Sequence, residues 1–189
     1  MTKPLGISGR IAAFFQTAQI TPLLALAALF ACPAAFAVDY PKFKPGQWEM
    51  TTTSDRPGTP PQKSTICFDA ALQQEMIDMG SGMRKELCSK SDIRQAGAQF
   101  ITDTECKFGN SVVKSHAVMT MTGDTAYRTE ADTTYEPPLM NDLRRAKTVV
   151  EARFVGACRD GLVPGDIVTG AGQKINIRQM QAERATKGK

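Results

Sequence analysis

His116 is the only histidine of the chain, and its neighbours decide which acid–base chemistry is open to it. Alternating apolar and polar residues on either side of Gly123 and Asp124 predict two antiparallel strands joined by a three-residue turn. In that register His116 lies directly across from Asp132, a carboxylate that would hold the imidazole in one orientation. The pair is either an acid–base dyad or an exposed cross-strand pair on the polar face. No serine lies in a nucleophile elbow, so we expect the exposed pair and no enzymatic activity.

A series of methionines provides a second candidate chemistry, that of a soft metal site. Met76, Met79 and Met83 form an M-x2-M-x3-M series, and thioether sulfur selects Cu(I). The alternative is that these side chains fill the core, because Met76 and Met79 fit the buried side of a short helix, where methionine is common. We favour the core. We expect no cofactor, since the sequence contains no phosphate-binding loop and no dinucleotide fingerprint.

The first 37 residues are typical of a secretory signal peptide. Lys3 and Arg10 form a basic start, the apolar run 23–30 follows, and Ala35-Phe36-Ala37 is a small-x-small cleavage site. Cleavage after Ala37 would place the protein in the periplasm or outside the cell. A second possibility is lipidation of Cys32, which follows Leu29-Phe30-Ala31. We expect membrane contact only through these N-terminal features.

Four cysteines remain after the signal peptide, and an even number in an exported chain is typical of two disulfides. None of them has the C-x2-4-C spacing of a zinc site. A hairpin around the central Ala-Gly-Ala turn places Cys88 directly across from Cys106, at a distance that a disulfide can span. The second disulfide then joins Cys67 to Cys158.

Charge argues against nucleic-acid binding. The signal peptide contains two of the 23 basic residues and none of the 19 acidic ones, so the mature chain is close to neutral. Such a chain has no dense basic field. Basic residues do gather in segment 169–189, which we expect to be a flexible tail, with contact to anionic lipid as the alternative.

The rest of the mature chain is dominated by strand patterns. Asp69 is placed to cap a short helix over residues 70–79, which Gly80-Ser81-Gly82 should end. Strands joined by short turns indicate a mainly β fold: an antiparallel curved sheet or partly closed β-barrel with one short helix, stapled by two disulfides, over residues 38–168. The clearest strand patterns cover residues 47–53, 88–94, 99–106, 111–121, 126–135 and 146–155.

The inner face of this sheet is apolar, which suggests a binding function. We expect a non-enzymatic exported domain that binds a small apolar ligand, a lipid or another envelope protein. The candidate lining residues are Trp48, Phe100, Met119, Tyr127 and Phe154.

Several short motifs resemble those of an exported bacterial family, domain of unknown function 3617, over about residues 43–160. They are Pro45-Gly46-Gln47-Trp48-Glu49, Cys67-Phe68-Asp69 after a proline-rich loop, Cys88, Cys106, Thr122-Gly123-Asp124 and Gly156-Ala157-Cys158. The resemblance implies a periplasmic or exported setting. It implies no activity, since the family has none established, and it supplies no catalytic residues.

Overall fold

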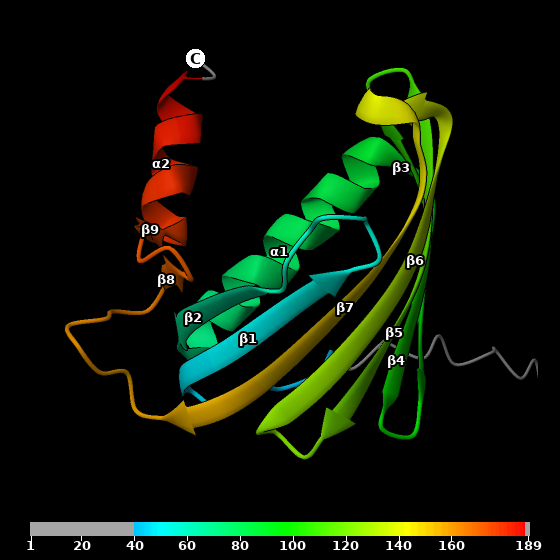
Figure 1. The fold of residues 1–189 in the computed structure, drawn as a ribbon. Helices are drawn as coiled ribbons and strands as arrows, with labels where there is room; N and C mark the ends of the chain where they lie inside the picture. Colours follow the sequence, from blue (N-terminus) through cyan, green and yellow to red (C-terminus); the bar gives the residue numbers. More distant parts are fainter. Residues whose placement is uncertain (1–39, 188–189) are drawn as a thin grey trace, which may run out of the picture. The chain divides into compact units, whose positions relative to one another are not determined.

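A computed structural model describes residues 40–187, so the predicted signal peptide and Cys32 lie outside the described residues. All nine strands form one antiparallel sheet in the order β3-β4-β5-β6-β7-β1-β2-β8-β9, with β3 and β9 at its two edges (Figure 1). The predicted mainly β fold is therefore confirmed, as an open sheet. The elements are β1 (Gly46–Ser54), β2 (Gln62–Phe68), α1 (Ala70–Leu87), β3 (Cys88–Ala96), β4 (Gln99–Phe108), β5 (Ser111–Thr122), β6 (Ala126–Leu139), η1 (Met140–Asp142), β7 (Leu143–Gly156), β8 (Asp166–Thr169), β9 (Lys174–Asn176) and α2 (Ile177–Lys187).

The predicted register of the central hairpin is confirmed. Met121 pairs with Tyr127 and His116 with Asp132, which leaves a turn of three residues. A slip of one residue would move every apolar side chain of both strands to the opposite face. The apolar residues of β5 and β6 therefore lie on the same face of the sheet, which we call the inner face. Trp48 of β1 lies on this face too, because β6 pairs with β7 and β7 pairs with β1.

Both predicted disulfides are present, Cys88–Cys106 and Cys67–Cys158. The first joins directly paired residues of β3 and β4. The second joins the buried end of β2 to the segment after β7. Disulfides of this kind persist in oxidising compartments, so they indicate an oxidising environment outside the cytoplasm.

The helix is longer than the sequence predicted: it continues through Gly80 and Gly82 to Leu87. Asp69 caps it as expected, because its carboxylate accepts the backbone N–H of Leu72 at 2.6 Å. Each glycine costs a helix interior about 1 kcal/mol. Tertiary contacts offset that cost, since Arg84 donates to the hydroxyl of Tyr40 at 3.0 Å and the helix leads directly into the disulfide-bonded strand β3.

The core lies between the inner sheet face and the first turns of α1. Trp48 and Leu72 are fully buried, and Ile66, Phe68, Ala152 and Ile177 complete the cluster. Phe43, from the segment before β1, packs against Trp48 and Tyr127, with ring centroids 5.5 and 5.2 Å away. The core is therefore aromatic at one end of the sheet and closed there by Phe43.

Segment 169–187 forms secondary structure where a tail over 169–189 was expected. It completes β8, then forms β9 and α2. The physical reason is a buried carboxylate: Asp166 accepts hydrogen bonds from Asn176 Nδ2 and the Val163 N–H and pairs with Lys174 Nζ at 2.8 Å. The hairpin that this network holds delivers Ile177 to the core.

Candidate functional site

One face of α1 carries a continuous series of apolar side chains. Leu72, Met76, Met79, Met83 and Leu87 follow one another at spacings of three or four residues, which keeps them on one side of a helix. Leu72 is fully buried and Met76 packs against the core, but Met79, Met83 and Leu87 are 38, 46 and 37 % exposed. The same face is therefore covered at its N-terminal end and open to solvent at its C-terminal end. We call Met79, Met83 and Leu87 the open methionine face.

Helix α2 borders this face on one side. Arg178 pairs with both oxygens of Glu75, at 2.9 and 3.0 Å, and Gln181 Nε2 contacts the sulfur of Met79 at 3.2 Å. From that junction the two helices diverge (Figure 1), so α2 leaves Met83 uncovered. Met180 of α2 is itself 38 % exposed. Both helices thus carry exposed methionines.

The helix extension explains why sequence analysis missed this face. A helix ending at residue 79 would have placed Met83 in a loop, and the expectation was that the methionines would lie in the core. That expectation holds for Met76 and is wrong for Met79. Met83, beyond the predicted end of the helix, is exposed as well. The signal was present as the heptad-like spacing from Leu72 to Leu87, which continues through the two glycines.

The five residues predicted to line a binding cavity are not brought together. Trp48, Tyr127 and Phe154 meet in the aromatic core, whereas Phe100 and Met119 form a cross-strand pair on β4 and β5. Trp48 has no exposed surface, and its indole N–H donates to the carbonyl of Lys44 at 2.9 Å. Burial also raises the pKa of Tyr127. The space near Trp48 is therefore filled by protein side chains, chiefly Phe43, which sequence analysis did not place there.

His116 is paired with a different carboxylate from the one expected. Its cross-strand neighbours are Asp132 on β6 and Asp103 on β4. The imidazole Nδ1 lies 2.7 Å from Asp103, whereas Asp132 pairs with Arg145 at 3.4 Å. Hydrogen bonds from His116 and then Arg94 hold the pKa of Asp103 below its usual value. The His116 side chain is 52 % exposed on the outer face, in a row of alternating charges.

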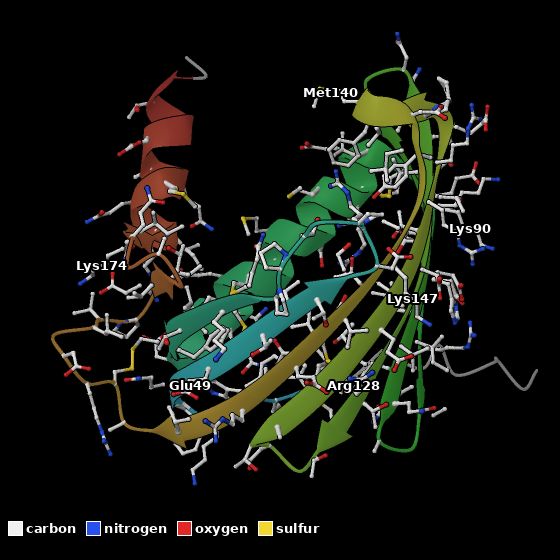
Figure 2. The ribbon with its side chains drawn as sticks, in the orientation of Figure 1. Glu49, Lys90, Arg128, Met140, Lys147 and Lys174 are labelled. Atoms are coloured by element: carbon white, nitrogen blue, oxygen red, sulfur yellow. A yellow bond between two sulfur atoms is a disulfide. The ribbon has the colours of Figure 1, made fainter. Side chains whose placement is uncertain are left out.

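A depression of about 680 Å³ lies on the outer face across β6, β7, β1, β2 and β8. Its floor carries the pairs Arg153–Glu49, at 2.6 Å, and Arg128–Glu151, together with Lys63. Figure 2 labels Glu49, on β1, and Arg128, on β6. Of the five predicted cavity residues only Tyr127 borders it. The lining of the depression combines these charged side chains with apolar residues such as Met50 and Val168, so it is not the apolar cavity that the sequence suggested.

Two negative findings apply to the described residues alone. No helix of residues 40–187 is long and apolar enough to cross a membrane. Nor does that region contain a group of three histidine, cysteine or acidic side chains placed to hold a metal ion.

Comparison with known proteins identifies the family of the chain. A family model described as "Protein of unknown function (DUF3617)" matches residues 43–158. This range covers β1 to β7, α1 and both disulfides, whereas β8, β9 and α2 follow it. No curated protein matches the chain.

Proposed function

The chain belongs to the DUF3617 family of proteins of unknown function, and we propose that it is an exported, non-enzymatic domain that binds an apolar ligand on the open methionine face. The observation that carries this proposal is the burial gradient along α1. A helix normally turns its apolar side to the protein interior. In α1 the core covers this side only as far as Met76, and the next two turns leave their apolar side chains exposed to solvent.

The chemistry of these side chains supports an apolar ligand. Burying a methionine or leucine side chain contributes about 1.5–3 kcal/mol, so three of them supply a useful binding free energy once covered. Methionine is flexible and polarisable, and it adapts to ligands of irregular shape. A single acyl chain of a lipid would fit this strip, because its methylene groups need no hydrogen-bonding partner.

The disulfides support export, and the surroundings of His116 support a non-enzymatic role. Two disulfides favour export, which we propose takes place through cleavage after Ala37. His116 and Asp103 line a depression of about 320 Å³ on the outer face, together with Ser115. A non-enzymatic role is supported by the hydrogen bonds there, because the Ser115 hydroxyl is bonded to Thr133 and the imidazole to Asp103.

A fluorescent long-chain fatty acid tests the proposal. The variant Met79→Gln/Met83→Gln keeps side-chain length but makes the face polar, and we expect its affinity to fall about tenfold or more. Met140→Gln is the matched control, because Met140 is also exposed but lies on η1. Equal affinity of the double variant and the unaltered chain would refute the proposal.

Cu(I) is a second candidate ligand, because Met76, Met79 and Met83 lie on one helix face with two sulfurs accessible. The variant Met79→Leu/Met83→Leu separates the two functions. It keeps the face apolar and removes the thioethers, so fatty-acid binding should persist while Cu(I) binding under reducing conditions should be lost. Loss of fatty-acid binding with retention of Cu(I) would contradict both assignments.

A further inference from the structure

A cleft of about 320 Å³ lies where the β1–β2 loop meets the β6–β7 connection. Three arginines line it, Arg56, Arg144 and Arg145, together with Asp55 and Asp142. We call it the arginine cleft. Three guanidinium groups around one small cleft are a common arrangement for binding phosphate, because each presents a planar fork of donors to two oxygens.

The two aspartates offset part of the positive charge of the arginine cleft. Asp55 is engaged with the backbone, since its carboxylate accepts the N–H of Lys147 at 2.8 Å. Asp142 pairs with Arg144 at 3.0 Å. Among the described residues Arg56 forms no ion pair. Arg145 pairs with Asp132 on the neighbouring strand at 3.4 Å. The three arginines still outnumber the two aspartates of the cleft, so it keeps a net positive charge, and Arg56 is the cation with which an anion can pair.

The most exposed large apolar side chains lie at the same end of the sheet. Met140, on η1, is 88 % exposed, and Phe108, at the end of β4, is 55 % exposed. The first residue of β5, Ser111, donates a hydrogen bond from its hydroxyl to the carbonyl of Pro137, near the end of β6, at 2.9 Å, which brings the β4–β5 turn close to the β6–β7 connection. Figure 1 shows the β4–β5 turn and η1 at one end, and Figure 2 shows Met140 beyond the ribbon there.

Phe108 also has a basic neighbour in Lys107, which is exposed and, within residues 40–187, forms no ion pair. Apolar side chains at a tip, bordered by cations, are the features that hold a peripheral protein at the surface of an anionic bilayer. The apolar groups enter the interfacial layer while the cations contact lipid phosphates.

We propose that this end of the sheet docks onto an anionic phospholipid membrane, with lipid phosphates in the arginine cleft and Met140 and Phe108 in the interface. This contact goes beyond the N-terminal features to which sequence analysis confined membrane contact. It is also separate from the proposed function, because it uses neither Met79 nor Met83.

Vesicle co-sedimentation at low ionic strength tests the docking. The full chain is compared with Arg56→Gln/Arg144→Gln/Arg145→Gln on phosphatidylglycerol and on phosphatidylcholine vesicles. Residues 1–37 are common to all variants, so differences between variants report on the described domain. The charge-matched control is Arg94→Gln/Arg128→Gln/Arg153→Gln, which removes three exposed arginines from the outer face.

We expect the arginine-cleft variant to partition about tenfold less into phosphatidylglycerol vesicles, while the control variant retains binding. Phe108→Gln/Met140→Gln should weaken binding to the same vesicles, and Val163→Gln/Met180→Gln, two exposed apolar positions elsewhere, should not. Should Arg56→Gln alone, which breaks no ion pair among the described residues, weaken binding measurably, folding defects are excluded as the cause.

Two results would overturn the docking. Equal losses in the arginine-cleft and control variants would show that net charge alone governs binding. Release from vesicles by excess soluble glycerol phosphate, with no effect of Phe108→Gln/Met140→Gln on binding, would assign the cleft to a free phosphate. Neither result bears on fatty-acid binding at Met79 and Met83, so the two proposals fail separately.

Discussion

Arg178 of α2 binds Glu75 of α1 through two parallel hydrogen bonds, at 2.9 and 3.0 Å, and its Nη2 also lies 3.4 Å from Asp69, the residue that caps α1. The hydrogen bonds to Glu75, followed by the charges of Glu75 and Asp69, raise the pKa of Arg178. This contact joins α2, which follows the range matched by the family model, to the helix that carries the open methionine face.

Removal of that contact should loosen α2 without unfolding the sheet. In Arg178→Gln we expect protease cleavage within residues 159–187 to become several-fold faster, because segments with fewer tertiary contacts open more often. Limited proteolysis followed by mass spectrometry measures this. Arg153→Gln, which removes an arginine paired with Glu49 on the outer face, is the control. Unchanged cleavage in Arg178→Gln would show that the other contacts of α2, those of Ile177 and Gln181, are sufficient to hold it.

The burial gradient of α1 predicts different costs for truncations on one helix face. Leu72→Ala should lower the free energy of unfolding by about 2–5 kcal/mol, because it leaves a cavity in the core. Leu87→Ala, the same substitution at an exposed position, should cost less than about 1 kcal/mol. Urea unfolding measures both. Similar costs would mean that the face is covered along its full length.

The two disulfides should differ in their contribution to stability. Cys67–Cys158 closes a loop with a sequence separation of 91, and Cys88–Cys106 one of 18. The chain-entropy model assigns them about 4.5 and about 3 kcal/mol. We expect Cys67→Ser/Cys158→Ser to lower the midpoint of chemical denaturation more than Cys88→Ser/Cys106→Ser. The reverse order would indicate that the β3–β4 hairpin needs its disulfide to pack at all.

Asp166 should make the β8–β9 hairpin sensitive to acid. Hydrogen bonds from Lys174, then Asn176, then the Val163 N–H lower the pKa of Asp166 to about 2. A carboxyl whose pKa is lower in the folded chain stabilises that chain above its unfolded value of 3.8, and the stabilisation is lost as the pH falls from about 4 to 2. Thermal unfolding should therefore show a steeper loss over this range for the unaltered chain than for Asp166→Asn. Parallel pH curves for the two proteins would contradict the assignment.

The alternation of apolar and polar residues predicted strand register and disulfide pairing correctly where the interacting residues lie in two strands of one hairpin. The β5–β6 register follows from alternation, since only one register keeps Met121 and Tyr127 on the apolar face. The Cys88–Cys106 disulfide follows from hairpin symmetry about a short turn. In both cases the interacting residues are close in sequence, and few alternatives compete.

The histidine shows where such reasoning ends. A residue in a central strand has two cross-strand neighbours, and the sequence around one turn revealed only Asp132. The second neighbour, Asp103, belongs to β4, and the imidazole contacts that carboxylate. The local pattern offered no way to choose between the two.

The sequence by itself determined the strand pattern, the pairing of four cysteines and the class of the fold, because alternation and hairpin symmetry are local properties of the chain. Only the tertiary structure decided which apolar residues are covered. Phe43 fills the space beside Trp48, and Met83 stays open because α2 diverges from α1. The burial of a side chain depends on which elements from elsewhere in the chain pack against it, and the hydrophobic periodicity of one segment contains no information about those elements.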